Sequence, residues 1–331
     1  MVSTGGYQAA RAGAAVLERD DRGRIFVSGV DRASWLQGLL TNDVQALKTG
    51  EGCYAAYLTP QGRMIADVFV YELGDVILLT LPLAQTKAVI ERLDQMVFSE
   101  DVQLGDATSA FRTRTIVGPE AARLLAAVLG ISAADLSALQ PHANRRMQYN
   151  GQPAIVTRVV DTGEPGYDIH VDLERADELM RALTAAGAAV LDPAEADAIR
   201  IEAGIPAFNR DMNEETIPLE AGIQSRAISF TKGCYVGQEV IIRVLHRGHG
   251  RVARKLVGLT LEGEAAPSAG AAVSADGRDV GHVTSSALSP ALKRPIALAY
   301  VHRDFVAPGT AVSVGGARGE VTALPFVGMN S

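Results

Sequence analysis

The alternation of apolar and polar positions predicts interleaved strands and helices over the first 200 residues. The run GRIFVSG, at residues 23–29, is apolar and rich in β-branched side chains, which is typical of a strand. Asp31 follows it and is placed to cap a helix. The apolar residues of that helix, from Trp35 to Leu40, share one face.

Three strand-like runs lie between residues 53 and 81. They are separated by the turns Pro60-Gln61-Gly62 and Leu73-Gly74-Asp75. Connections this short cannot carry a parallel crossover, so the runs are expected to form an antiparallel meander. A helix is then predicted over residues 83–98, because apolar residues recur there at helical spacing.

The same interleaving continues to residue 204. A strand leads to Val117, and a helix opens at Pro119. Asn150-Gly151 is a hairpin signal between two strands. Two further helices are predicted over residues 174–187 and 193–204, each ending at a glycine. Short hairpins mixed with helices favour an α+β fold with antiparallel sheets over a doubly wound parallel sheet.

The pattern changes after Arg254. The remaining residues form short strand-like runs separated by Gly, Pro and Asp turns, and no helical period survives. This is typical of a small all-β barrel. We therefore expect two interleaved α+β subdomains within residues 1–250, followed by a β-barrel domain at residues 251–331.

Composition narrows the class of protein. The 331 residues are 47% hydrophobic and 21% charged, with a net charge of −7, which does not favour nucleic acid or anionic membranes. There is no signal-peptide pattern and no run near the ~18 apolar residues of a membrane span. The two cysteines are too few for a disulfide scaffold. We expect a reduced, cytoplasmic monomer with no membrane partner and no stable nucleic-acid partner.

The segment TKGCYVGQEV, residues 231–240, contains Cys234. Turn-forming residues surround this cysteine, and Lys232 lies two positions before it. A nearby ammonium would stabilise a reactive thiolate, whereas a lone cysteine is more often a buried core residue. One thiolate cannot by itself hold an iron–sulfur cluster. The next run, residues 239–246, is strand-like, and Cys53 is most simply a core residue.

Glu164 lies in a tight turn, Thr162-Gly163-Glu164-Pro165-Gly166, between two strand-like halves. The turn is expected to direct its carboxylate outward. A solvated turn residue is one interpretation. The other is a rigid carboxylate that accepts two parallel N–H bonds from an amino-heterocycle such as a pterin.

Two charged segments follow in the sequence. The acidic loop at residues 211–215 lacks the ligand spacing of a calcium-binding loop, so we interpret it as solvated. Basic residues are dense from Arg243 to Lys255, which indicates either a solvated surface or an anion site. Polyglutamate, phosphate or RNA would suit this stretch equally. The sequence contains no phosphate-binding loop, nucleophile elbow or C-x-x-C motif.

KGCYVGQE resembles the signature of the YgfZ family of folate-binding proteins, which act in iron–sulfur cluster assembly and repair. That family is similar in fold to the glycine-cleavage T-protein, a tetrahydrofolate-dependent aminomethyltransferase. Segments along nearly the whole chain match in the expected order, including LTPQGRMIADVFVY, TGEPGYDIHV and RIEAGIPAFNRDMNEETIPLEAG. The resemblance implies a three-part fold with tetrahydrofolate in a central channel. It also implies transient contact with iron–sulfur client or scaffold proteins.

The resemblance assigns roles to individual residues. Glu164 looks like the pterin anchor, Arg200 and Glu202 match a helix end around the channel, and Cys234 is the key reactive residue. The predicted catalytic residues are Cys234, Lys232 and Asp67. The predicted cofactor-binding residues are Glu164, Tyr167, Arg200, Tyr235, Gln238 and Arg243.

Two departures from true aminomethyltransferases bear on activity. Those enzymes carry two adjacent acids where this chain has Ala66-Asp67, and their N-terminal segment is expected to be missing here. The leading hypothesis is therefore a tetrahydrofolate-binding factor for assembly or repair of four-iron clusters, rather than an aminomethyltransferase. The alternatives are a folate-dependent aminomethyl or other one-carbon transferase that uses Asp67, and an RNA-interacting module that uses the basic stretch.

Overall fold

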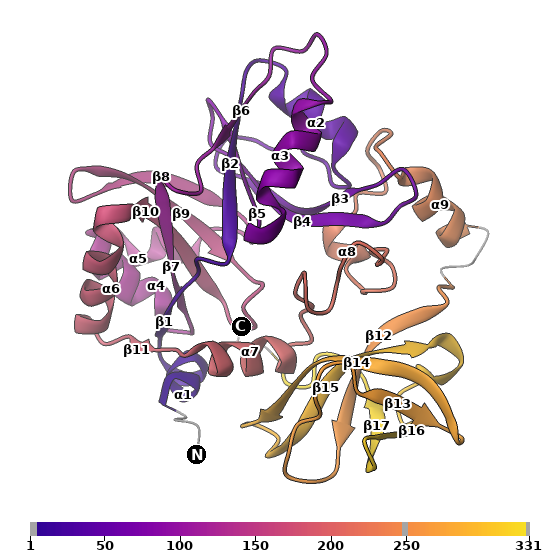
Figure 1. Ribbon diagram of the computed structural model, residues 1–331. Helices are drawn as coiled ribbons and strands as arrows, with labels where there is room; N and C mark the ends of the chain where they lie inside the picture. Colours follow the sequence, from indigo (N-terminus) through magenta and orange to yellow (C-terminus); the bar gives the residue numbers. More distant parts are fainter. Residues whose placement is uncertain (1–4, 247–250, 329–331) are drawn as a thin grey trace.

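The computed structural model describes residues 5–246 and 251–328, which form two sheet-and-helix units and a barrel (Figure 1). The predicted α+β class is confirmed, and most strand pairs are antiparallel. Within the described residues, no helix combines the length and the apolar character needed to cross a membrane.

The first sheet has five strands in the order β3-β4-β5-β2-β6. Its strands are β2 (Arg22–Ser28), β3 (Gly52–Leu58), β4 (Met64–Glu72), β5 (Ile77–Pro82) and β6 (Gln103–Asp106). The predicted meander is confirmed, because β3, β4 and β5 pair antiparallel in sequence order. β4 is buried along its whole length, so both faces of the sheet are covered.

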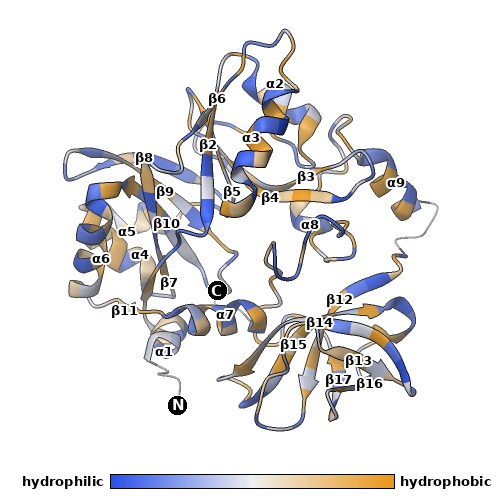
Figure 2. Ribbon diagram, in the orientation of Figure 1, coloured by the Kyte–Doolittle hydropathy of each residue, from blue (hydrophilic) through white to orange (hydrophobic). Residues whose placement is uncertain are grey.

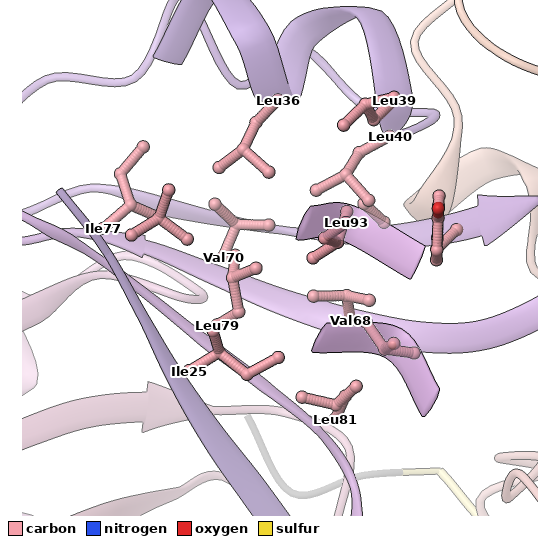
Figure 3. Packing of buried hydrophobic residues seen from close by; sticks show 14 of the residues in the cluster. Ile25, Leu36, Leu39, Leu40, Val68, Val70, Ile77, Leu79, Leu81 and Leu93 are labelled. Carbon is pink, nitrogen blue, oxygen red and sulfur yellow. The ribbon is translucent and has the colours of Figure 1, made fainter. Parts of the chain in front are cut away.

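Helices α2 (Arg32–Leu39) and α3 (Thr86–Asp94) cover one face of this sheet. The packing is apolar, with Leu36 and Leu93 meeting Val68 and Leu79 of the strands (Figure 3). A 3-10 turn, η1 (Leu83–Gln85), precedes α3. We call this packing the helix-side core.

Two details of these helices differ from prediction. Asp31 does not cap α2 with its side chain, because its Oδ2 atom accepts the N–H of Asp101 at 2.9 Å. Helix α3 ends at Asp94, before the predicted residue 98. There the Trp35 indole N–H donates to the carbonyl of Met96 at 3.0 Å, and this bond fixes the chain beyond the helix.

The second sheet has the order β11-β1-β7-β10-β9-β8. Its strands are β1 (Ala15–Glu18), β7 (Phe111–Val117), β8 (Asn144–Tyr149), β9 (Gln152–Val159), β10 (Gly166–Asp172) and β11 (Ala189–Val190). β1 and β11 pair in parallel, and the other pairs are antiparallel. Asn150-Gly151 forms the predicted hairpin turn between β8 and β9.

Helices α4, α5 and α6 pack with the second sheet around one apolar core. Their bounds are α4 (Ala121–Leu129), α5 (Ala133–Ser137) and α6 (Ala176–Ala185), with η2 (Leu173–Arg175) before α6. Polar and apolar residues mix along α6 in Figure 2, as expected of a helix with one buried face. Helix α1 (Gly5–Ala12), which the sequence pattern did not predict, leads into β1.

The other face of the first sheet packs against the described residues of the Ile205–Val252 segment, and we call this second apolar cluster the central core. The segment contains α8 (Gln224–Ala227) and α9 (Gln238–His246). The predicted strand at residues 239–246 is wrong, because α9 occupies it. Glu239 and Arg243 pair at 2.6 Å one turn apart and stabilise the helix.

The predicted C-terminal barrel is confirmed as a closed barrel, β12-β15-β14-β13-β16-β17. Its strands are β12 (Arg254–Leu261), β13 (Ala272–Ala275), β14 (Arg278–Ser289), β15 (Arg294–His302), β16 (Ala311–Val314) and β17 (Ala317–Thr322), with η3 (Arg303–Phe305) after β15. Helix α7 (Pro193–Glu202) packs on β14. After the barrel the chain returns to α7, where the N–H of Phe326 donates to the carbonyl of Glu202 at 2.8 Å (Figure 1).

Candidate functional site

Asp67 is the buried carboxylate of the central core. Successive residues of β4 point to opposite faces, so Ala66 packs in the helix-side core while Asp67 faces the other way with Phe69. Asp67 is 5% exposed, and its Oδ2 atom accepts the Tyr54 hydroxyl at 3.2 Å. Its Oδ1 atom has no hydrogen-bond partner in the described part of the chain, although an Arg22 guanidinium nitrogen lies 3.6 Å away.

A row of ring contacts runs beside this carboxylate. The ring centroids of Tyr54 and Phe69 are 4.9 Å apart, and those of Phe69 and His142 are 5.5 Å apart. The Arg22 guanidinium lies 4.6 Å from the Phe69 ring, and that of Arg226 lies 5.4 Å from the Tyr54 ring. The site therefore combines a buried acid, two cations and three neighbouring rings that are tilted to one another. These groups come from the first sheet, the α5–β8 connection and the Ile205–Val252 segment.

Burial and neighbouring charges shift the pKa values of residues in and near the aromatic row. Burial and the nearby Asp67 carboxylate raise the pKa of Tyr54 well above its ordinary value, so its hydroxyl keeps its proton. Burial opposes ionisation of Asp161, but its ion pair with Arg19 brings the pKa of Asp161 down to about 2. The row therefore includes a hydroxyl donor at Tyr54, and a fixed negative charge at Asp161 acts on His142.

Glu164 lies in the turn between β9 and β10, as predicted, but its carboxylate is fully buried instead of pointing outward. It forms an ion pair with Arg11 of α1. The same guanidinium pairs with Glu202, which also accepts the Tyr7 hydroxyl at 2.7 Å. Glu164 therefore joins α1 to the end of α7, and its role as a pterin anchor stays a prediction.

Tyr167 and Arg200 lie in other networks. The Tyr167 ring packs in the helix-covered core of the second sheet, and its hydroxyl donates to the carbonyl of Leu136 at 2.9 Å. Arg200 pairs with Asp211 at 2.7 Å and donates to the Ser285 hydroxyl at 2.8 Å, which ties α7 to the barrel. No contact brings either residue to Asp67 within the described residues.

Lys232 binds the end of helix α2. Its ammonium donates to the carbonyls of Gln37, Leu40 and Asn42 at 2.6, 2.6 and 2.9 Å. Burial lowers the pKa of Lys232 to about 8. These carbonyls engage the ammonium, so Lys232 anchors its loop to helix α2, and its predicted role beside Cys234 stays a prediction.

The two cysteines differ in environment. Cys234 is exposed, which excludes the interpretation of a buried core residue. Cys53 is partly buried and packs against the helix-side core, in keeping with the prediction for it. Burial raises the pKa of the Cys53 thiol to about 12, and the Lys232 ammonium opposes this shift. The positive charge thus acts on Cys53.

The rest of the cysteine segment packs against the first sheet. Gly237 has φ +84°, and a Cβ there would lie 2.5 Å from the carbonyl oxygen of Thr59, so a side chain would be excluded. Tyr235 is buried in the central core, and Gln238 begins α9. Arg243 is exposed and paired with Glu239. In the basic stretch, Arg254 pairs with Glu220 at 3.2 Å, whereas Arg247 and His249 lie outside the described residues.

Sequence reasoning identified Asp67 but missed the groups around it. Tyr54 and Phe69 could have been found, because a two-residue period along paired strands places them on the face of Asp67. Arg22, His142 and Arg226 come from three distant segments, and no local signal connects them. Only the packing of the two sheets with the Ile205–Val252 segment brings these residues together.

Two sheet-and-helix units followed by a closed barrel define an aminomethyltransferase-like fold. The crystal structure of glycine cleavage system aminomethyltransferase T from Bartonella henselae matches with a TM-score of 0.87 at 24% identity, over 97% of this chain and 88% of that one. Residues 3–232 match the GCVT N-terminal domain, and residues 254–327 match the glycine cleavage T-protein C-terminal barrel domain. The chain belongs to the glycine cleavage T-protein family.

Curated relatives match most of this chain, and they are named aminomethyltransferases. The chain is 34% identical to an aminomethyltransferase of Streptomyces coelicolor, over 97% of this chain and 88% of the relative. It is 35% identical to one of Rubrobacter xylanophilus, over 89% of this chain and 78% of the relative. The predicted cofactor, tetrahydrofolate, is the one that aminomethyltransferases use, and this prediction is confirmed by family membership.

The predicted role in iron–sulfur cluster assembly, with its client proteins, is wrong. The relatives above are aminomethyltransferases, which support the wider superfamily and not the iron–sulfur branch. The argument against transfer chemistry rested on the expected lack of an N-terminal segment and on Ala66, where an acid is missing. That position faces the helix-side core, so its replacement removes no carboxylate from the face that holds Asp67.

Proposed function

We propose that this protein is a tetrahydrofolate-dependent aminomethyltransferase. Membership of the glycine cleavage T-protein family supports the proposal, and the arrangement around Asp67 supplies its chemistry. The observation that carries it is a buried carboxylate with one oxygen bonded to Tyr54 and the other, Oδ1, unbonded among the described groups. Such an oxygen can accept a hydrogen bond from a ligand.

Asp67 would stabilise positive charge on a folate amine. Tetrahydrofolate supplies the nitrogens that accept the one-carbon unit, and a nitrogen gains positive charge as it forms the new bond. A carboxylate fixed in a poorly solvated site stabilises such charge more strongly than water does. Tyr54 holds the orientation of Asp67, and Arg22 balances its charge when no ligand is near.

The aromatic row suits the flat ring system of the cofactor. Tyr54 and Phe69 are buried in the central core, and aromatic faces bind planar heterocycles by offset stacking. Arg226 is exposed beside Tyr54, and its guanidinium forms no ion pair with the other described residues. It could meet a negatively charged part of the ligand.

The test is transfer by the purified protein. It is mixed with the other components of a glycine cleavage system and tetrahydrofolate, and methylenetetrahydrofolate is measured over time. Formation that depends on this protein supports the proposal. A folded protein that binds tetrahydrofolate but gives no turnover would contradict transferase activity and leave a folate-binding protein.

A further inference from the structure

His142 lies in the connection between α5 and β8, where the two sheets meet. Its N–H donates to the carbonyl of Arg158 in β9 at 3.0 Å. Two residues further along the chain, the side-chain amide of Asn144 donates to the carbonyl of Glu51 at 2.8 Å. On the opposite side, Gly52 of β3 lies so close that a Cβ would be 2.4 Å from the His142 carbonyl oxygen. The backbone of His142 is therefore fixed from both sheets.

This fixed backbone has an unusual conformation. His142 has φ +64°, in the left-handed region, which costs a residue with a side chain about 1 kcal/mol. Such a conformation persists where the surrounding structure determines it from several sides, and residues of this kind concentrate at ligand sites. The positive φ alone does not assign a role to the His142 side chain.

The imidazole extends the aromatic row of the Asp67 site. Its ring lies 5.5 Å from that of Phe69 at an interplanar angle of 36°. Its Nδ1 atom is buried and has no hydrogen-bond partner within residues 5–246 and 251–328. A buried polar atom without a partner costs about 1–3 kcal/mol, so a bound group that pairs with it would be stabilised.

The electrostatic setting of the ring fixes its hydrogen-bonding ability. Burial lowers the pKa of His142; the Asp161 carboxylate opposes this shift and the Arg226 guanidinium adds to it. The imidazole is therefore neutral at neutral pH. A neutral imidazole has one N–H donor and one acceptor nitrogen, a pair that matches the alternating donors and acceptors at the edge of a pterin.

We propose that His142 is a further ligand-contacting residue of the Asp67 site, which hydrogen-bonds to the polar edge of the pterin ring and favours that heterocycle. This inference rests on the proposed function. Asp67 would meet the amine that takes up the one-carbon unit, and His142 would hold the ring on the Phe69 side. Asp67 lies in β4 of the first sheet and His142 in the α5–β8 connection, so the pterin would bridge the two units.

The experiment measures binding of three probes by calorimetry: tetrahydrofolate, tetrahydropterin and 4-aminobenzoylglutamate, which lacks the pterin. His142→Phe keeps a ring against Phe69 but removes both nitrogens. We expect the Kd of tetrahydrofolate and of tetrahydropterin to rise about tenfold, as for one lost hydrogen bond. Binding of 4-aminobenzoylglutamate should not change.

Two further variants separate ligand contact from folding. His142→Asn keeps a donor and an acceptor and tolerates a positive φ, so it should recover most of the pterin affinity. His282→Phe is the matched control, because His282 also lies beside an aromatic ring, 6.0 Å from that of Tyr300, and burial also lowers its pKa. Its three Kd values should equal those of the wild type.

Unchanged pterin affinity in folded His142→Phe would overturn the inference. Equal losses for all three probes would also overturn it, because they would indicate a general structural effect. Absence of pterin binding by the wild type would overturn this inference and the proposed function together. If His142→Phe does not fold, nitrogen NMR of histidine-labelled wild type decides the question: tetrahydropterin must shift the imidazole signal that His142→Asn removes.

Discussion

The hydroxyl of Tyr54 donates to the Oδ2 atom of Asp67 at 3.2 Å across two neighbouring strands of the first sheet. This bond orients the carboxylate and leaves its second oxygen, Oδ1, toward Arg22. Both residues are buried, so water does not compete strongly for the bond.

Asp67→Asn should lower kcat/KM for one-carbon transfer about 100-fold or more, because the amide keeps the shape but not the charge that stabilises the folate amine. The assay is methylenetetrahydrofolate formation, with thermal unfolding measured in parallel. Asp75→Asn changes an exposed aspartate at the end of the β4–β5 turn and serves as the control. Full activity in Asp67→Asn would contradict the role of this carboxylate.

Tyr54→Phe should lower kcat/KM about tenfold, since it removes one hydrogen bond to a charged group. The loss should fall mainly on kcat, because the ring that would stack with the ligand remains. Tyr149→Phe, a buried tyrosine in the core of the second sheet, is the matched variant and should act as the wild type does. An effect of equal size in both variants would argue for a general packing defect.

Arg11→Met should destabilise the protein by about 3 kcal/mol, because it removes a cation from between two buried carboxylates, Glu164 and Glu202. Urea unfolding measures the change. Arg123→Met removes an exposed pair with Glu120 and should cost under about 1 kcal/mol. Similar losses in the two variants would show that the buried network contributes little.

Iodoacetamide should modify Cys234 in the folded protein and leave Cys53 unmodified near neutral pH. Cys234 is exposed, whereas burial raises the pKa of Cys53 to about 12 and removes its reactive thiolate. Peptide mass spectrometry measures both sites. In urea the two cysteines should react alike, and fast labelling of folded Cys53 would contradict the packing described.

Lys232 should make stability depend on pH between about 8 and 10.5. Its folded pKa is lowered to about 8 from 10.5, so in this window the unfolded chain binds more protons than the folded one. The free energy of unfolding should therefore rise with pH, relative to a variant that lacks the group. Urea titrations of wild type and Lys232→Met at pH 7.5 and 9.5 measure this difference. A difference that falls as pH rises would contradict the burial of Lys232.

Several elements show how far local patterns reach. The β3–β4–β5 meander, the Asn150-Gly151 hairpin and the barrel followed from turn residues and two-residue alternation, which act between neighbours in the sequence. Helix α9 was not predicted, because its β-branched residues are typical of a strand. The ion pair between Glu239 and Arg243, one helical turn apart, is the feature that indicates a helix. The roles of Glu164 and Lys232 also depended on distant partners, Arg11 and the end of α2.

Local patterns were sufficient to predict the α+β class, the barrel and a candidate acid at Asp67. These depend on periodicity and composition, which each segment carries on its own. By contrast, it is the packing of distant segments that brings the Arg22 guanidinium to 3.6 Å from Asp67 and the His142 ring to 5.5 Å from that of Phe69. Burial and charge pairing at this site depend on how two sheets and a long segment pack, and no single stretch of sequence encodes that packing.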